Sequence, residues 1–341
     1  MKALVLSGGG ARGAYEAGVI AGLHAAGETF DIVCGTSIGA INGSFVAQDK
    51  FDQLDRVWHT IGSRGVITLL PQVQKLRSIV AEIVGAGHDP IFKRAADVMT
   101  LIHDLASFGP PSHILALVGA LESEPIANIL SGNLVLNDLK RTLVVSTTNL
   151  TRSTSDTFYH FPDKAAEEKF VHEQTNAYAL TEENFIDAVR ASASIPGAFS
   201  PVCIAVGEKG DSCHYVDGGV ANNTPIGQAI NAGATDVTVI FMDPDDGQPA
   251  DQPIANLAQI GMACFSVMQQ KILASDLRTA QSVNQTAKAA GSNKRVIKIR
   301  TVRPATPMAM TVLQFDNQPL LDAAYQIGLQ DAAHNLTIVA E

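Results

Sequence analysis

The chain has 341 residues, which is enough for one large α/β unit or for two domains of about 150 residues each. Apolar residues make up 46% of the chain, charged residues make up only 17%, and the 28 glycines follow no period, which excludes disordered and collagen-like proteins. The 24 lysines and arginines against 34 aspartates and glutamates give a net charge of -10. This charge repels phosphate backbones, so we expect no nucleic acid as a partner.

The cysteines and the N-terminus indicate a reducing compartment. Four cysteines are spread along the chain without a CxxC pair, and a chain of this length does not need disulfides for its stability. The first apolar run, residues 3–6, is too short for a signal peptide. No apolar stretch approaches the roughly 18 residues of a membrane-spanning helix. We therefore expect a cytoplasmic protein without a transmembrane segment, while export by a specialised secretion system stays open.

Two strand-turn-helix units open the chain. The apolar run 3–6 predicts a buried strand, which enters a glycine turn and then a helix over residues 15–26. A second strand over 30–34 leads through another glycine turn into a helix over 40–47. Two such units in succession indicate parallel strands with helices on the faces of the sheet.

The pattern changes between about residues 58 and 131, where helical segments are broken by glycine and proline. Apolar residues over 73–84 recur at helical spacing and form one face. We interpret 58–131 as a helical insertion or cap on a single domain that spans residues 1–341. The apolar face packs on the core or, alternatively, lines an acyl groove or contacts a bilayer.

Strands and helices alternate again in the second half of the chain. Together with the two opening units, this alternation predicts an α/β fold with a mostly parallel central sheet and helices on its faces. The loop 243–253, rich in proline and aspartate, is a candidate linker. The expected strands lie at 142–147, 202–206, 237–242 and 295–302, and the expected helices at 183–193 and 257–289.

The strongest chemical signal is Gly35-Thr36-Ser37-Ile38-Gly39, a GxSxG between a predicted strand and a predicted helix. A nucleophilic serine needs a sharp turn there, and glycines on both sides relieve crowding around it. The N-terminus of the following helix favours developing negative charge. The alternative interpretation is a tight turn that happens to contain serine.

A nucleophilic serine also needs a base. The late histidine of a Ser-Asp-His order has one candidate, His334, at an apparent helix end. The better candidate is Asp217, which a predicted strand delivers into the turn Gly218-Gly219. Aspartate is a weak base at neutral pH, so this role requires burial that raises its pKa. The alternative is an ordinary Asp-Gly turn.

The run Gly8-Gly9-Gly10-Ala11-Arg12-Gly13 follows the first strand. Consecutive glycines can direct several backbone N–H groups into one cavity, which suits an oxyanion or a phosphate, and Arg12 adds a positive charge or anchors the loop. The run also satisfies GxGxxG, the dinucleotide fingerprint. That fingerprint expects an acid after the second strand, whereas Asp31 lies at the start of that strand.

The three motifs in this order and separation resemble the patatin-like phospholipase family. Further similarity comes from the block 191–202, upstream of Asp217, and from Asn223-Thr224-Pro225. The resemblance implies a three-layer α/β/α fold and a Ser-Asp dyad that hydrolyses lipid acyl esters without a metal or an organic cofactor. Its site residues here are the nucleophile Ser37, the base Asp217, the oxyanion-hole residues Gly8, Gly9 and Gly10, and the supporting residues Arg12, Gly35, Gly39, Gly218 and Gly219.

The expected activity is therefore that of a serine lipid acyl hydrolase, such as a phospholipase A, lysophospholipase or carboxylester lipase. Two alternatives stay open, a nucleotide-binding oxidoreductase and a catalytically inactive lipid-binding relative. The expected substrate is a lipid ester. Because the net charge is -10, any contact with a membrane is expected to be transient, peripheral and local. The motifs give no oligomeric state.

Overall fold

The structure is a computed structural model that describes residues 1–66, 68–69, 74, 119–207, 209–244, 263, 267–268, 284, 296–334 and 337–340. Most of the proposed insertion at 58–131, including the apolar face over 73–84, lies outside the described residues. The helix expected over 257–289 and most of the loop 243–253 also lie outside them.

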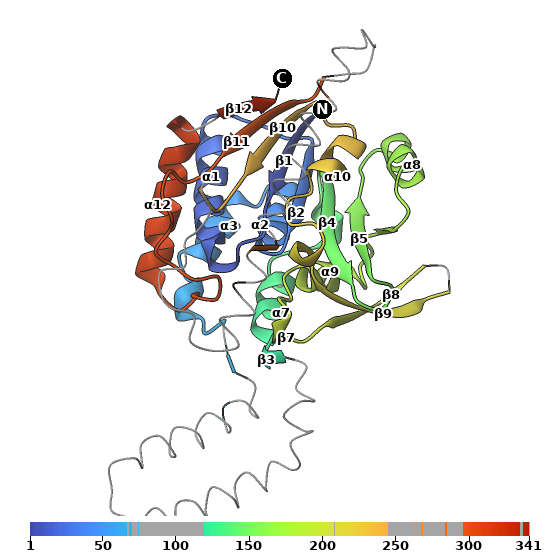
Figure 1. The fold of residues 1–341 in the computed structure, drawn as a ribbon, viewed down its shortest axis with the longest axis horizontal. Coiled ribbons are helices and arrows are strands. Elements are labelled where there is room, and N and C mark those ends of the chain that lie inside the picture. Colours follow the sequence, from blue (N-terminus) through green and yellow to red (C-terminus); the bar gives the residue numbers. More distant parts are fainter. Residues whose placement is uncertain are drawn as a thin grey trace, which may run out of the picture.

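Within the described residues, ten strands form one mixed sheet through the middle of the molecule (Figure 1). Its order is β12-β11-β10-β1-β2-β4-β5-β6, with β9 paired to β4 and β8 paired to β9. The central pairs from β11 to β4 are all parallel. The strands are β1 (Lys2–Leu6), β2 (Ile32–Thr36), β4 (Thr142–Asn149), β5 (Thr154–His160), β6 (Ala177–Ala179), β8 (Val202–Val206), β9 (Asp211–Asp217), β10 (Asp236–Ile240), β11 (Lys298–Val302) and β12 (Thr337–Ala340).

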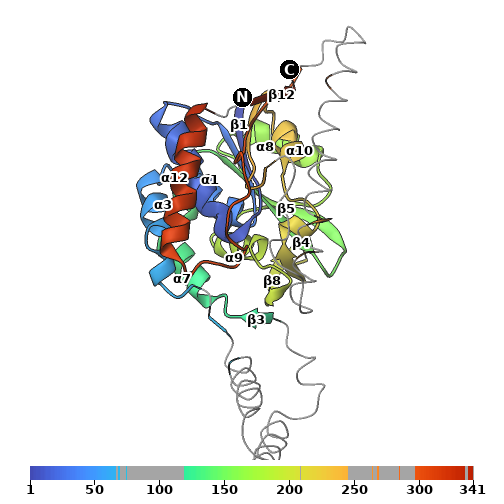
Figure 2. The ribbon, with the colours of Figure 1, turned by 60° about the vertical axis from the view of Figure 1, so that its left-hand side comes forward.

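Helices cover both faces of this sheet, which gives the expected three layers (Figure 2). One face carries α1 (Gly13–Ala25), α2 (Ile38–Ala47), α3 (Phe51–Trp58), α7 (Glu124–Ser131), α9 (Phe185–Ser192) and α12 (Gln318–His334). The other face carries α8 (Lys164–His172) and α10 (Ile226–Asn231). A separate parallel pair, β3 (Gly119–Leu121) and β7 (Gly197–Phe199), lies beside α7.

The apolar residues of β1 show why the sheet is buried on both faces. Side chains alternate across a strand, so Leu4 and Leu6 belong to the core under α1 and α2. Ala3 and Val5 belong to the core under α8 and α10. A parallel strand with helices on both sides therefore appears in the sequence as an uninterrupted apolar run.

Most of the expected central elements are confirmed, with shifted ends. The second strand begins and ends two residues later than expected, because Gly35 and Thr36 still pair with β4. The helix after it starts at Ile38, directly after Ser37. The strands β5, β6 and β12 were not expected from the sequence. The sequence of β5, TSDTFYH, is rich in polar residues, and its residues toward Thr154 are only partly buried or exposed, so it lacks a continuous apolar run.

Candidate active site

Ser37 occupies the sharp turn between β2 and α2. Its backbone has φ 57° and ψ -128°, a left-handed conformation that is costly for a residue with a side chain. The two flanking glycines make this turn sterically allowed. A Cβ on Gly35 would meet the carbonyl of Gly39, and one on Gly39 would meet the carbonyl of Leu6. The GxSxG motif therefore forms the strand-turn-helix expected from the sequence.

Two strands of opposite direction bring Asp217 to Ser37. The strand β2 pairs in parallel with β4 as far as Thr36 opposite Ser146. The strand β9 pairs antiparallel with β4 and ends with Asp217 opposite Thr147. The other edge of β4 is occupied there by β5, so β2 and β9 meet end to end along one edge of β4. Residues that end these two strands must therefore lie close together.

The two side chains form a hydrogen-bonded pair. The Ser37 hydroxyl donates to Oδ2 of Asp217 at 2.5 Å. The other carboxylate oxygen, Oδ1, accepts the backbone N–H of Gly219 at 2.7 Å. Burial of Asp217 raises its pKa to about 7, although both hydrogen bonds act to lower it. The carboxyl group therefore titrates near neutral pH, in the range where a general base is effective.

The glycine run after β1 lies against the serine. A Cβ on Gly8 would come within 3.1 Å of Cβ of Ser37, and Gly10 lines the same cavity as Ser37. The N–H of Gly8 already donates to the carbonyl of Asn223 at 3.2 Å. The N–H groups of Gly9 and Gly10 have no acceptor among the described residues. These two amides are therefore better candidates than Gly8 for stabilising an oxyanion.

Arg12 anchors the glycine loop. Its side chain is only 6% exposed and forms an ion pair with Asp243 through Nη1, while Nε donates to the carbonyl of Gly9 at 3.4 Å. Of the two roles considered from the sequence, the geometry supports the anchor. Asp243 lies in the loop 243–253 that the sequence indicates as a candidate linker, and its contact with Arg12 was not predicted. Its position, directly after the predicted strand 237–242, was the available signal.

Gly10 also connects this loop to the C-terminal part of the chain. Its φ is +59°, and a Cβ there would collide with the carbonyl of Val312. That carbonyl accepts the N–H of Ala11 at 2.8 Å. The segment around Val312 therefore lies on the glycine loop, a contact that no motif of the sequence indicated.

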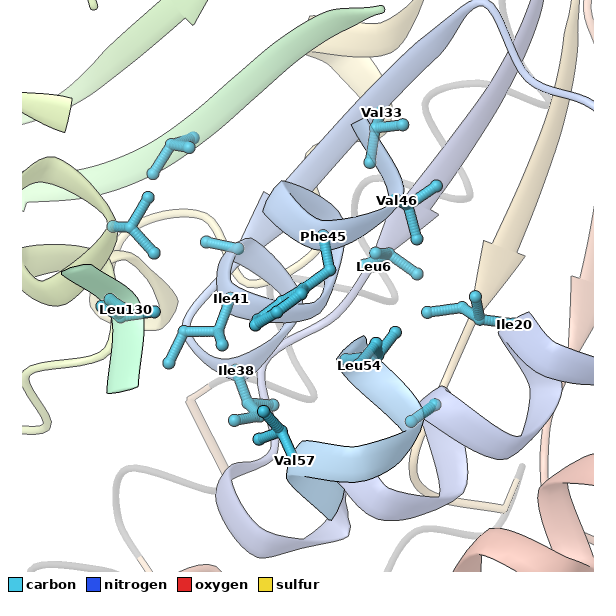
Figure 3. Close-up of a cluster of buried hydrophobic side chains, with 14 of the residues drawn as sticks. Leu6, Ile20, Val33, Ile38, Ile41, Phe45, Val46, Leu54, Val57 and Leu130 are labelled. Carbon is cyan, nitrogen blue, oxygen red and sulfur yellow. The ribbon is translucent and has the colours of Figure 1, made fainter. Parts of the chain in front are cut away.

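An apolar cavity opens beside Ser37. Ile38, Leu54 and Val57 come from α2 and α3 and lie close together in Figure 3. Leu130 of α7 also lines the cavity and lies apart from these three side chains in Figure 3. The remaining lining residues are Gly10, Ile41, Asn42, Trp58, Ile61, Val66, Ile126, Ile129, Ala193, Ile195, Phe199, Leu313 and Phe315. A lining of this kind suits a hydrocarbon chain.

A buried polar chain runs from this cavity to α1. Trp58 Nε1 donates to Asn42 Oδ1 at 2.9 Å, and Asn42 Nδ2 donates to Oε1 of Glu16 at 2.9 Å. Burial raises the pKa of Glu16 well above its usual value, while the hydrogen bonds from Asn42 and from the backbone of Ser7 oppose this shift. The raised pKa favours the neutral carboxylic acid at this position.

The structure leaves His334 at the last position of α12, as expected for a helix end. Among the side chains that the structure describes, no histidine bonds to Ser37 or Asp217. Nor do three His, Cys, Asp or Glu residues of the described ranges gather as a metal site. The sequence analysis also missed Ser192, whose hydroxyl accepts the N–H of Ser37 at 2.9 Å.

Comparison with known proteins identifies the family. A model described as Patatin-like phospholipase matches residues 4–230, which is more than half of the chain. The chain therefore belongs to the patatin-like phospholipase family. The matched region includes the glycine run, Ser37 and Asp217.

Several relatives carry the name lysophospholipase. The chain is 25% identical over 249 residues to Lysophospholipase NTE1 of Lodderomyces elongisporus, which covers 73% of this chain and 13% of the relative. It is 24% identical over 247 residues to Lysophospholipase NTE1 of Scheffersomyces stipitis, covering 72% of this chain and 12% of the relative. This chain thus spans only about an eighth of the length of these relatives.

Among solved structures, the chain is similar to VipD from Legionella pneumophila. It is 16% identical, with a TM-score of 0.39 over 97% of this chain and 66% of VipD. Among the described residues of this chain, no helix is both long enough and apolar enough to cross a bilayer.

Proposed function

We propose that this protein is a serine hydrolase that cleaves the acyl ester of a lipid with Ser37 and Asp217. The observation that carries the proposal is the hydrogen bond of 2.5 Å between the Ser37 hydroxyl and a fully buried carboxylate. The pKa of that carboxyl group, about 7, suits proton transfer at neutral pH. The apolar cavity beside Ser37 supports an acyl chain as the group that is bound.

The reaction proceeds in two similar steps. Ser37 Oγ attacks the ester carbonyl while Asp217 accepts the hydroxyl proton, and the proton then passes to the leaving alcohol. Water attacks the resulting acyl-enzyme while Asp217 takes a proton from the water. Asp217 then returns this proton to Ser37 Oγ as the bond between Oγ and the acyl group breaks and the fatty acid leaves. Asp217 thus takes the role that histidine has in a Ser-His-Asp triad. Its raised pKa makes it a stronger base than an ordinary aspartate.

The oxyanion of each step is proposed to bind the amides of Gly9 and Gly10. Both amides lack an acceptor among the described residues, and Gly10 lines the cavity together with Ser37. The N-terminal end of α2, which begins at Ile38, adds favourable electrostatic potential. Losing one donor of this kind typically lowers kcat by about 10²- to 10³-fold.

The substrate class is proposed from the cavity and from the relatives. An almost entirely apolar lining provides for a hydrocarbon chain and offers little to a polar headgroup. Two relatives of similar sequence over more than 70% of this chain are named lysophospholipases. We therefore favour an ester with one acyl chain, such as a lysophospholipid, over a triacylglycerol. Local peripheral contact with a membrane is part of the proposal, and flotation with liposomes that leaves the protein unbound would refute it.

The experiment is a substrate panel combined with covalent labelling. Wild type, Ser37→Ala and Asp217→Asn are compared on short-chain esters, phospholipids, lysophospholipids and acylglycerols, and with a fluorophosphonate probe. We expect hydrolysis and labelling by the wild type, no labelling of Ser37→Ala, and no hydrolysis by either variant. Binding of a fatty acid without labelling or turnover would instead identify a lipid-binding relative. A rise in melting temperature with a nicotinamide cofactor would favour the oxidoreductase alternative.

A further inference from the structure

The last residue of α9 and the residues that follow it contact both Ser37 and Asp217. The hydroxyl of Ser192, the last residue of this helix, is completely buried. It accepts the backbone N–H of Ser37 at 2.9 Å and donates to the carbonyl of Ser146 at 2.6 Å. Because the single hydroxyl proton is directed to Ser146, an oxygen lone pair remains for the amide of Ser37.

Ser37 needs such a partner because its conformation is unfavourable. A residue with a side chain at φ 57° and ψ -128° is stable only where its surroundings hold it there. The carbonyl of Ser37 is held by the N–H groups of Ala40 and Ile41, at 2.9 and 3.3 Å. Its N–H is held by the hydroxyl of Ser192. This hydrogen bond is therefore the side-chain contact that holds the backbone N–H of Ser37, at the start of the turn.

The same segment also holds the other half of the dyad. Two residues after Ser192, the carbonyl of Ser194 accepts the N–H of Asp217 at 2.9 Å. The carbonyl of Asp217 accepts the hydroxyl of Thr148 at 2.9 Å. Ser37 and Asp217 are 180 residues apart in the sequence, and the segment 192–194 connects both of them over one short stretch of backbone.

We propose that Ser192 is a positioning residue, which acts through Ser37 and keeps its hydroxyl within reach of Asp217. The inference rests on the proposed function, because it concerns the same dyad. It assigns to the sequence Ala191-Ser192-Ala193-Ser194 a role in setting the geometry of the reacting groups. The acyl cavity itself does not depend on the Ser192 hydroxyl, which is not among its lining residues.

The test separates turnover from binding. In Ser192→Ala the Ser37 amide loses its acceptor, and we expect kcat to fall by about 10²-fold, since small misplacements of reacting groups have effects of this size. KM should stay within about 2-fold of wild type, because binding is not altered. Ser192→Thr keeps an oxygen at the same place and should recover most of the lost kcat.

Ser44→Ala is the matched control. Ser44 is a fully buried serine in α2, whose hydroxyl donates to the carbonyl of Ala40 at 2.7 Å. It shares the helix that follows Ser37 but does not contact the dyad. The control measures what loss of one buried hydroxyl does to folding and activity, and we expect its kcat to match the wild type. A loss in Ser192→Ala no larger than that in Ser44→Ala would overturn the proposal.

Two further outcomes are informative. If Ser192→Ala does not fold, Ser192→Cys replaces the oxygen by a poorer acceptor of similar shape, and an unchanged kcat in that variant would overturn the proposal. Ser37→Ala is measured on the same substrate. Residual hydrolysis at the wild-type rate in Ser37→Ala refutes the proposed function itself. Inactive Ser37→Ala together with fully active Ser192→Ala refutes only the positioning role.

Discussion

The two faces of the central sheet are both packed with apolar side chains but differ in what else is buried there. The core under α1, α2 and α3 borders the cavity beside Ser37 and the polar chain through Glu16 and Asn42. The core under α8 and α10 is mostly aliphatic, with aromatic contacts such as the one between Phe161 and Phe170. One face of the same sheet therefore carries the proposed active site, which we call the reactive face, and on the other face we expect the contacts to serve stability.

The comparison predicts that substitutions on the reactive face change activity, and the largest loss is expected for Asp217→Asn. The variant removes the proposed base, so kcat should fall on the order of 10⁴-fold. In the wild type, kcat/KM should rise with pH to a plateau, with an apparent pKa near 7, because the base must be ionised. Rate measurements between pH 5 and 9 test both statements. A variant with near-native activity would refute the assignment of the base.

The same substitution should change the pH dependence of stability. The folded pKa of Asp217, about 7, lies above the value of about 3.9 for an unfolded aspartate. The folded state thus binds the proton more tightly, and the resulting stability is complete below pH 4 and is lost as pH rises through 7. Asp217→Asn should therefore flatten melting temperature against pH in this window. A profile that keeps its slope would show that Asp217 is not the titrating group.

On the opposite face, Phe170→Ala should destabilise the fold and spare the chemistry. Phe170 is fully buried, and truncation of such a phenylalanine typically costs 3–5 kcal/mol. Urea denaturation gives the free energy of unfolding. Titration with the fluorophosphonate probe gives the concentration of active sites, and the hydrolysis rate divided by this concentration gives kcat, which should match the wild type. Phe45→Ala in α2 is the matched variant on the reactive face. Phe45→Ala should lower both the free energy of unfolding and kcat. A normal kcat in Phe45→Ala would show that the two faces do not differ in their effect on activity.

A smaller effect is expected for the anchor of the glycine loop. Arg12→Gln removes the buried contact with Asp243 and loosens the loop that carries Gly9 and Gly10, so kcat should fall about 10- to 100-fold. Arg152→Gln is the control, because Arg152 pairs with the exposed Asp211 at 2.8 Å and exposed pairs contribute little. Equal rates for the two variants would exclude the anchoring role.

The smallest change is expected in selectivity. Phe315→Ala enlarges the cavity wall next to Trp58, whose ring centroid lies 6.3 Å away. The ratio of kcat/KM for bulky and slender acyl groups should shift about 10-fold towards the bulky ones, because a methylene in an apolar pocket is worth about 1–3 kcal/mol. Phe161→Ala on the other face should leave this ratio unchanged. An unaltered ratio in Phe315→Ala would mean that the acyl chain does not reach this wall.

The sequence predicted those features that depend on neighbours in the chain. The turn at Ser37 needs only a strand, two glycines and a helix, and Asp217 needs only a strand that ends at Gly218-Gly219. Both are local patterns, so the sequence alone predicts both side chains as site residues. Sequence patterns could not show that β2 and β9 meet end to end on β4. That meeting depends on pairings between residues more than 60 positions apart.

The missed contacts share this physical origin. Asp243 lies far along the chain from its partner Arg12, and Ser192 reaches Ser37 across 155 positions. A buried hydroxyl or an ion pair of this kind leaves no periodic pattern, because its partner is chosen by the tertiary structure. The resemblance to the family drew attention to the block around Ser192, but it gave that block no physical role.

The contact between Ala11 and the carbonyl of Val312 bears on how the chain can be divided. The family model ends at residue 230, yet Asp243 forms an ion pair with Arg12 and Phe315 lines the cavity beside Ser37. The strand β10, which lies beyond residue 230, also pairs with β1 along its whole length. A fragment that ends at residue 230 would lack the contacts of Asp243 and Val312 with the glycine loop and the side chain of Phe315 in the cavity wall. We therefore expect the proposed activity to require the chain at least through Phe315.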